Sequence, residues 1–310
     1  MIKNKKLITF KIPATSANIG SGFDSVGLAL NLYNEIHIYE NDNSKKIEFE
    51  IFGEGENEIS KKDNMIYSAM KLVFKKLKSK PNKGDIIKCI NRIPISRGLG
   101  SSSAAIIGGL LCANYMLGDK LSIEKDILNM AVQIEGHPDN VAPAILGGIV
   151  SGVVKKEEDF KYIKIKPPKN LKAIVSIPDF YLSTEIARNI LPKEITRKDA
   201  IFNISRAALL TSALFSNRLD LLEIATEDKI HQDYRAKFIP NLNQLFKETK
   251  KAGAYSVTIS GAGSSILALA KDDKNIIEKV SKAMHYSFKK KNINSVIKVL
   301  NIPTKGIIIN

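Results

Sequence analysis

The chain has 310 residues, of which 44% are hydrophobic, and its formal net charge is +15. This length suits one large or two medium-sized domains with a sizeable core. No apolar run reaches the roughly 18 residues that a membrane span needs, so we expect no membrane partner. The charge first suggests nucleic-acid binding. However, only seven cations are arginine, the lysines are scattered, and no helix-turn-helix, RNP or zinc-finger pattern accompanies them. We therefore expect no nucleic-acid partner.

The N-terminal segment is basic and then apolar, which is the general order of a secretory signal. Thr9 and Lys11 interrupt its apolar part, which is also too short for such a signal. We therefore expect residues 7–12 to form the first strand and the protein to be cytoplasmic. The two cysteines agree, because Cys89 and Cys112 lie in apolar runs without metal-ligand spacing, as is typical of buried thiols.

The first half of the chain mixes predicted strands and helices. Alternating or apolar runs predict strands at 7–12, 33–41, 45–55 and 85–95. We expect the strands at 33–41 and 45–55 to pair with each other. Helical spacing of apolar residues predicts helices at 63–78 and 122–136. Between them, a glycine-rich loop that begins near residue 98 leads into a third predicted helix, which ends at residue 117. Small and β-branched residues fill 140–154. The charged, proline-containing segment 155–170 is the candidate domain junction, which predicts domains at 1–160 and 161–310.

The second half begins with a predicted strand at 171–180. Helices are expected near 183–190, 198–216, 218–236, 240–253 and 274–290. Strands are expected on both sides of a glycine turn within 254–270, and again at 295–300 and 305–309. Strands and helices do not alternate strictly along the chain, so we predict an α+β fold with two subdomains.

The segment GLGSSSAA at 98–105 has the composition of an anion-binding loop. Glycines let the main chain turn with its N–H groups pointing inward, and the positive end of the next helix then favours phosphate. Serine hydroxyls add donors. No lysine follows Gly98 or Gly100, so this is no Walker A loop, and the dinucleotide-binding pattern is missing too. Taken alone, the segment is equally consistent with the serine-capped start of a buried helix.

Two further glycine-rich loops accompany this segment, PATSANIGSGFDSVG at 13–27 and ISGAGSSILAL at 259–269. The order and wording of the three loops resemble the three motifs of the GHMP small-molecule kinases, which include galactokinase, homoserine kinase and mevalonate kinase. The resemblance spans nearly the whole chain. It implies a GHMP kinase fold, with an N-terminal ribosomal-protein-S5-like nucleotide domain and a C-terminal ferredoxin-like domain.

Segments outside the loops resemble the homoserine kinases of this family most closely. These segments are EGHPDNVAPAILGG at 135–148, STEIARNILP at 183–192 and HQDYRAKFIP at 231–240. The resemblance implies ATP-dependent phosphorylation of the side-chain hydroxyl of L-homoserine to O-phospho-L-homoserine, a step of threonine biosynthesis.

Residue spacing supports an amino-acid substrate independently. Thr184 and Arg188 are four residues apart, as are His231 and Arg235, so each pair would share one face of a helix. Two guanidinium groups suit a carboxylate, and arginine is rare in this chain. An α-amino group calls for an acid, and Asp24 of the first loop is available. For either helix alone, a solvent-facing pair is the alternative.

The resemblance also implies which residues bind each substrate. Asn18 and Asp24 would hold the amino acid's polar end, Arg188 and Arg235 its carboxylate, and Asn140 would lie near its hydroxyl. The expected substrate-binding residues are Asn18, Asp24, His137, Asn140, Thr184, Arg188, Arg235 and Gly261. The expected nucleotide-binding residues are Asn64 near the adenine and, around the triphosphate, Pro94, Ile95, Ser96, Arg97, Gly98, Leu99, Gly100, Ser101, Ser102, Ser103 and Ala104.

ATP and Mg²⁺ are the cofactors that the resemblance implies. The metal ligands expected from the family are a loop serine, assigned to Ser102, and a glutamate of the following helix, assigned to Glu135. Gln133 occupies a neighbouring slot, where an acid would also be plausible. Mg²⁺ prefers oxygen ligands and keeps several waters while it bridges phosphates.

The catalytic candidates are Asn140, Asp139 and Arg97. Some family members have an aspartate base beside the acceptor hydroxyl, where this chain has Asn140. An amide cannot take a proton at neutral pH, so we predict catalysis without a strong side-chain base. Asp139 as the base is the competing hypothesis, and it predicts a loss of about 10²–10⁴ in turnover when the carboxylate is removed.

Two kinds of alternative function remain at this stage. The nearer one is a GHMP kinase with another acceptor, such as mevalonate or a branched amino alcohol. The more distant one is a non-catalytic sensor or a nucleic-acid-binding module that uses the positive charge. The family also often forms dimers, which makes a homodimer the expected assembly.

Overall fold

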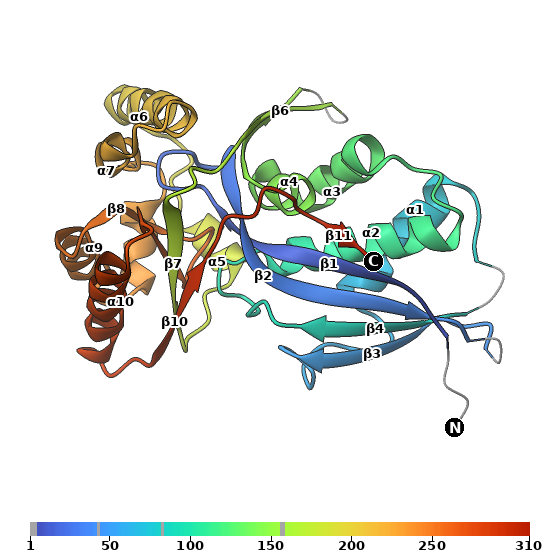
Figure 1. Ribbon diagram of the computed structural model, residues 1–310. Helices are drawn as coiled ribbons and strands as arrows, with labels where there is room; N and C mark the ends of the chain where they lie inside the picture. The colour runs from blue at the N-terminus through green and yellow to red at the C-terminus, as the bar shows by residue number, and fades with distance from the viewer. Residues whose placement is uncertain (1–4, 42–43, 82–83, 156–158) are drawn as a thin grey trace.

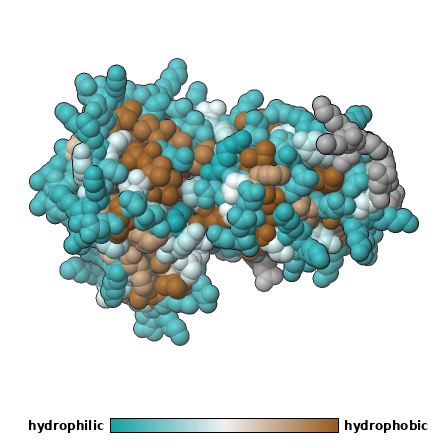
Figure 2. Space-filling model, turned by 90° about the horizontal axis from the view of Figure 1, so that it is seen from below, coloured by the Kyte–Doolittle hydropathy of each residue, from teal (hydrophilic) through white to brown (hydrophobic). Residues whose placement is uncertain are grey.

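The computed structural model describes residues 5–41, 44–81, 84–155 and 159–310. Within these residues the chain forms one sheet of seven strands and one of four, with helices packed against each (Figure 1). Seen from below, the molecule has two lobes, and apolar side chains gather on both (Figure 2). The predicted α+β fold class is confirmed.

The larger sheet contains most strands of the first half of the chain. In sheet order its main path is β11 (Ile308–Ile309), β1 (Lys6–Ala17), β2 (Val26–Tyr39), β4 (Ile86–Asn91) and β3 (Glu48–Gly53). Two more strands extend from β2, first β5 (Ile149–Val154) and then β6 (Phe160–Ile165). All neighbours are antiparallel except β3 and β4.

Two expectations for this sheet are wrong. The segments 33–41 and 45–55 do not pair with each other, because β4 lies between β2 and β3. Helix α1 (Met65–Lys76) carries the chain from β3 across to β4, and such a crossover makes the two strands parallel. The loop expected at 13–27 is also shorter, since β1 continues to Ala17 and β2 already begins at Val26.

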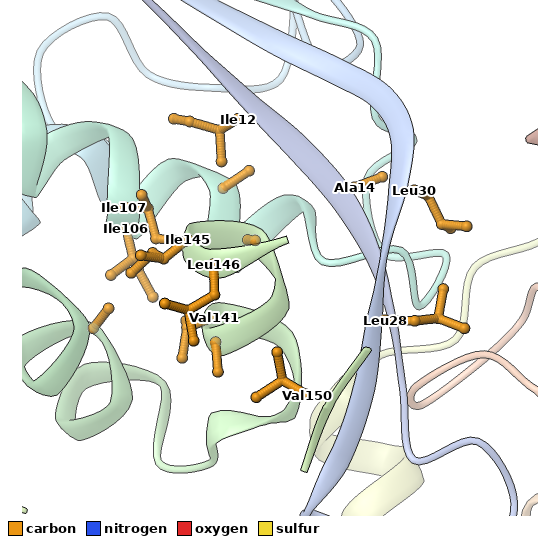
Figure 3. Close-up of a cluster of buried hydrophobic side chains, with 14 of the residues drawn as sticks. Ile12, Ala14, Leu28, Leu30, Ile106, Ile107, Val141, Ile145, Leu146 and Val150 are labelled. Atoms are coloured by element: carbon orange, nitrogen blue, oxygen red, sulfur yellow. The ribbon is translucent and has the colours of Figure 1, made fainter. Parts of the chain in front are cut away.

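Helix α2 (Ser101–Met116) is the central helix of this half, and most of its residues are buried. It contacts α1, β1, α3 (Leu128–Glu135) and α4 (Pro138–Leu146). Figure 3 shows Ile106 and Ile107 of α2 beside side chains of α4 in one apolar cluster. Because it is apolar on all sides, α2 can approach these neighbours closely and its first turn is held in a fixed place.

The sequence did not predict α4. Its small and β-branched residues do not show clear helical spacing. Pro138 at its start, however, has the fixed φ that suits a first helical turn. Gly147, with φ 77°, ends it. The helix expected at 122–136 begins with a π-helical turn, η1 (Ile123–Ile127), before α3.

The smaller sheet has four strands, and their order across the sheet differs from their order along the chain. These strands are β10 (Ser295–Leu300), β7 (Leu171–Pro178), β9 (Ile266–Lys271) and β8 (Ala254–Ile259), and all neighbours are antiparallel. Two amphipathic helices, α9 (Leu242–Lys251) and α10 (Lys274–Lys289), pack against this sheet and against each other. This is the ferredoxin-like arrangement that was predicted for the second subdomain.

The single helix expected at 218–236 is wrong. The segment forms short pieces instead: η2 (Leu219–Leu221), α7 (Leu222–Ala225) and α8 (Gln232–Arg235), followed by η3 (Ala236–Phe238). The break has a local cause, because the Asp228 carboxylate accepts bonds from the N–H groups of His231 and Gln232 at 2.8 and 2.7 Å. These bonds hold the turn that precedes α8, whose N-cap residue His231 makes no side-chain cap bond of its own. Before this segment lie α5 (Thr184–Asn189) and α6 (Arg197–Phe215).

The chain passes between the two sheets twice. β6 still belongs to the larger sheet, so the first passage falls between Ile165 and Leu171, a few residues after the division expected at 160, and residues 156–158 of the expected junction lie outside the described residues. After β10 the chain returns, and Ile309 pairs with Phe10. On the way, the N–H of Gly148 donates to the carbonyl of Pro303 at 2.7 Å.

Two smaller expectations concern membranes and cysteines. None of the helices in the described part of the chain is both long and apolar enough to cross a bilayer. Cys89 and Cys112 are buried free thiols, as predicted. Burial raises the pKa of Cys89 to about 12, so this thiol stays protonated and unreactive.

Candidate active site

A cavity of about 310 Å³ collects nearly all the predicted site residues. Its wall combines the three glycine-rich loops with α1, α5, α8 and the segment between α3 and α4. The predicted residues that line it are Asn18, Asp24, Asn64, Pro94, Ile95, Ser96, Arg97, Gly98, Leu99, Gly100, Ser101, Ser102, Ala104, Glu135, His137, Asp139, Asn140, Thr184, Arg188, Arg235 and Gly261. Ser103 lies just behind this wall and is fully buried.

The loop before α2 is pressed between the other two glycine-rich loops. Gly98 and Gly100 both have φ 72°, a left-handed conformation that side chains disfavour. A Cβ on Gly98 would lie 2.1 Å from the carbonyl oxygen of Ser260, and one on Gly100 would lie 2.1 Å from Oγ1 of Thr15. The N–H of Thr15 donates to the carbonyl of Leu99 at 3.1 Å. The three motifs therefore form one main-chain assembly.

No side chain caps the N-terminus of α2, where Gly100 is the N-cap residue. The alternative of a serine-capped helix is therefore wrong. The positive end of a helix of 16 residues faces the cavity with the Ser101 and Ser102 side chains beside it. Such an end attracts an anion, because the first-turn N–H groups have no partner within the helix.

Glu135, the last residue of α3, lies against this helix end. Its carboxylate accepts hydrogen bonds from the hydroxyls of Ser103 at 2.9 Å and Ser102 at 3.3 Å. Glu135 lines the cavity, whereas the neighbouring candidate Gln133 does not. A carboxylate and a hydroxyl at a phosphate site form an oxygen donor set of the kind that Mg²⁺ prefers.

One end of the cavity is apolar. Ile51, Ile59, Met65 and Cys89 line it, and apolar side chains of this kind are typical of small-molecule pockets. Asn64 borders this end and uses its side chain to cap α1. Its Oδ1 accepts from the N–H of Tyr67 at 2.9 Å, and its Nδ2 donates to the carbonyl of Ser60 at 3.1 Å.

Arg97 points away from the helix end toward the second sheet. Its guanidinium lies over the ring of Tyr181, with 3.9 Å between Cζ and the ring centroid. The side chain is 9% exposed, and its Nη1 has no hydrogen-bond partner among the described residues. Tyr181 was not predicted as a site residue, because it lies about 80 residues further along the chain and no motif links it to Arg97.

The opposite end of the cavity is strongly charged. Asp24 receives two hydrogen bonds from Arg188, Nη2 to Oδ1 at 2.8 Å and Nη1 to Oδ2 at 3.1 Å. Asn18 supports this carboxylate, because its Oδ1 accepts from the N–H of Asp24 at 3.0 Å. Burial opposes the charge on Arg188, but the bonds to Asp24 outweigh burial and raise the pKa of Arg188.

Arg235 lies beside this ion pair and is only 1% exposed. Burial and then the nearby Arg188 lower its pKa to about 10, so it stays charged at neutral pH. Its bonds run to the carbonyls of Ala187 and Gly261 and to the ring of His231. The solvent-facing alternative is therefore wrong for the pair His231 and Arg235.

His137 and Asp139 form a second pair at this end. Nδ1 of His137 lies 2.5 Å from Oδ1 of Asp139, which is 2% exposed. Burial opposes the charged ring, but the bond to Asp139 outweighs burial and raises the pKa of His137. Asn140 is held separately, because its Oδ1 accepts from the hydroxyl of Thr15 at 2.8 Å. The Asp139 carboxylate is thus occupied by His137 rather than unpaired.

Family models match both halves of the chain. The GHMP kinases N terminal domain matches residues 64–148, and the GHMP kinases C terminal model matches residues 210–286. Fold, cavity and models together define a GHMP kinase. This confirms the resemblance that the three motifs suggested.

Individual relatives show which branch of the GHMP kinases this chain resembles. A homoserine kinase of Clostridium beijerinckii is 45% identical over 269 residues, which are 87% of this chain and 88% of that protein. One of Halothermothrix orenii is 42% identical and covers 98% of this chain and 96% of its own. The crystal structure of homoserine kinase from Cytophaga hutchinsonii superposes with a TM-score of 0.87 at 29% identity, covering 100% and 98% of the two chains. The chain belongs to the homoserine kinase family. A mevalonate kinase of L. major, at 15% identity and a TM-score of 0.72, shares the fold.

Proposed function

We propose that this protein is an ATP-dependent homoserine kinase, which forms O-phospho-L-homoserine for threonine biosynthesis. The observation that carries the proposal is the charged end of the cavity, where Asp24, Arg188 and Arg235 meet. An α-amino acid carries an ammonium and a carboxylate on one carbon. Asp24 suits the ammonium, and the two guanidinium groups suit the carboxylate.

The Asp24–Arg188 pair explains the preference for an acceptor with both charges. Each group neutralises the other across 2.8 Å. An amino acid can replace both halves of this pair at once. An acid without an amine, such as mevalonate, would separate Arg188 from Asp24 and leave that carboxylate without a cation, which costs free energy in a partly buried site.

The nucleotide would lie along the rest of the cavity, with its base in the apolar end beside Asn64. Its triphosphate would meet the N–H groups at the start of α2, where the left-handed glycines give close approach. Ser102 and Glu135 would hold Mg²⁺, and their oxygen donors fit this ion. When bound, Mg²⁺ neutralises charge on the phosphate oxygens.

Phosphoryl transfer depends chiefly on position and charge, because its transition state is loose. Asn140, fixed by Thr15, would orient the acceptor hydroxyl toward the γ-phosphate. We infer that no strong side-chain base acts here, since Asp139 already pairs with His137. The hydroxyl proton would pass to phosphate directly or through water. Arg97 lines the same cavity, with its guanidinium stacked on Tyr181, and would add positive charge to it.

A coupled ADP-release assay tests this function. We expect turnover with L-homoserine and ATP and little with mevalonate, and faster turnover with mevalonate would overturn the proposal. Arg188→Ala should lower kcat/KM for homoserine by about 10²-fold, since a hydrogen bond to a charged group contributes about 1.5–3 kcal/mol, and leave the KM for ATP unchanged. Arg218→Ala is the matched control, because Arg218 also pairs with an aspartate but is exposed and distant from the cavity.

The homodimer, the cytoplasmic location and the absence of a nucleic-acid or membrane partner stay predictions from the sequence.

A further inference from the structure

His231 is a fully buried histidine that lies behind the charged end of the cavity and does not line it. Its ring bridges two parts of the site that are far apart in sequence. Nε2 lies 2.9 Å from the carbonyl oxygen of Gly20, and Nδ1 lies 3.1 Å from Nη1 of Arg235. The ring also stacks on Phe23, with 5.0 Å between centroids and 24° between planes.

These two contacts define the protonation of the ring. A carbonyl oxygen can only accept, so Nε2 of His231 must carry a hydrogen. A guanidinium can only donate, so Nδ1 must present its lone pair to Arg235. Only the neutral tautomer with hydrogen on Nε2 satisfies both partners. Burial lowers the pKa of His231 and supports the neutral form. The acidic neighbour Asp228 lies 3.7 Å from Nε2, too far for a hydrogen bond, and its oxygens already accept main-chain N–H groups.

The bond to His231 completes the fixation of Arg235. Nε donates to the carbonyl of Ala187 at 3.1 Å, and Nη1 donates to the carbonyl of Gly261 at 3.0 Å as well as to His231. Three of the five guanidinium hydrogens are therefore used, one on Nε and two on Nη1. The two on Nη2 take no acceptor among the described residues, and Arg235 lines the cavity.

We propose that His231 is a positioning residue, whose neutral ring aims the Nη2 hydrogens of Arg235 at the carboxylate of the acceptor substrate. It also ties Arg235 to the first loop, because Gly20 and Phe23 belong to the same turn as Asn18 and Asp24. The ring thereby fixes the distance between the group that binds the carboxylate and the group that binds the amine. This inference rests on the proposed function.

Two substitutions separate the halves of this role. His231→Asn keeps an acceptor where Nδ1 was and loses the donor to Gly20. His231→Gln keeps a donor where Nε2 was and loses the acceptor for Arg235. Both lose the stack on Phe23, and they differ from each other by one methylene group. We expect His231→Gln to raise the KM for homoserine by about tenfold or more, and His231→Asn to raise it by less than about threefold. Neither should change the KM for ATP.

A substrate without the carboxylate provides the internal control. 3-Amino-1-propanol has the hydroxyl and the amine of homoserine but nothing for Arg235 to bind. Its kcat/KM should be equal in His231→Gln and His231→Asn. In an Arg235→Met background, His231→Gln should have no further effect on the KM for homoserine. Equal KM values for homoserine in the two His231 variants, or an equal loss for both substrates, would overturn the inference. No homoserine turnover by the unmodified protein would instead overturn the proposed function.

A measurement on the unmodified protein covers the case in which His231→Gln does not fold. Nitrogen-15 NMR of labelled histidine reports the tautomer of each ring, and the signal of His231 is the one that His231→Asn lacks. We expect a neutral ring with hydrogen on Nε2 at pH 7. A charged ring, or hydrogen on Nδ1, would contradict the proposed contact with Arg235.

Discussion

The two ends of the cavity are built from different parts of the polypeptide. The end at the start of α2 consists of main chain and hydroxyl groups from one continuous stretch, the loop at 98–100 and the first turn of α2, and Gly98 and Gly100 have left-handed conformations. The charged end consists of ionised side chains, and Asp24, Arg188 and Arg235 come from three separate elements. Under the proposed function, the first end would hold the triphosphate through main-chain N–H groups, whereas the second would select the acceptor by charge.

This difference has consequences for mutation. A site made of main chain depends on the absence of side chains, so it is damaged when atoms are added. A site made of paired charges depends on partners, so it is damaged when one member is removed and the other is left buried. Substitutions that add atoms should therefore impair the main-chain end, and substitutions that remove a charge should impair the charged end.

The largest effect is expected at Glu135, where a side chain does contribute to the main-chain end. Glu135→Gln keeps the shape but removes the negative charge, so binding of Mg²⁺ beside Ser102 should weaken. We expect kcat to fall by about 10²- to 10³-fold, since metal stabilisation of phosphoryl charge contributes several kcal/mol. A titration of kcat against Mg²⁺ concentration checks this. Glu124→Gln is the control, because Glu124 is an exposed acid at the start of η1, and it should leave kcat and its Mg²⁺ dependence unchanged. An unchanged Mg²⁺ dependence in Glu135→Gln would remove Glu135 from the metal site.

The next largest effect tests whether added atoms damage the loop. Gly100→Ala would bring a Cβ within 2.1 Å of Oγ1 of Thr15, and displacement of the loop should lower kcat/KM for ATP by about 10²-fold. Gly118→Ala is a matched control, because Gly118 has φ 83° and no atom within 4 Å of a Cβ. It should cost roughly 1 kcal/mol of stability through backbone strain and leave kinetics unchanged. Equal kinetics for the two variants would show that the close approach is unimportant.

The smallest effect is expected at Asp139. Asp139→Asn removes the negative charge beside His137 but keeps an oxygen that can accept from its ring, and it removes no proton acceptor that the proposed reaction uses. We expect kcat within about tenfold of the unmodified value. A loss toward the upper part of the 10²–10⁴ range would instead make Asp139 the general base. Comparison of kcat at pH 6 and pH 8 sharpens the result, because the raised pKa of His137 depends on this carboxylate and should fall in the variant.

The same contrast explains what the sequence could predict. The glycine loop and α2 follow from local composition, because left-handed turns need glycine and a helix end is local. The cavity also contains Glu135 and Arg188 as predicted. The stacking of Arg97 on Tyr181 and the bridge through His231 could not be found, because each joins segments that only the tertiary structure brings together.

The errors in the fold have similar causes. The pairing of β4 with both β2 and β3 depends on long-range register, which local alternation does not contain. The break before α8 depends on which polar group captures the free N–H donors, and Asp228 does so with its side chain. Helix α4 was missed because alanine, valine and isoleucine suit a buried helix as well as a strand.

The return of the chain to β1 has a consequence for biosynthesis. β11 and the segment before it complete the edge of a sheet whose other strands are translated far earlier, with Ile307 and Gly306 lying against α4. The edge of β1 that β11 covers therefore stays unpaired until residues 308–309 have been synthesised. During that interval the unpaired N–H and C=O groups of this edge are open to pairing with another strand.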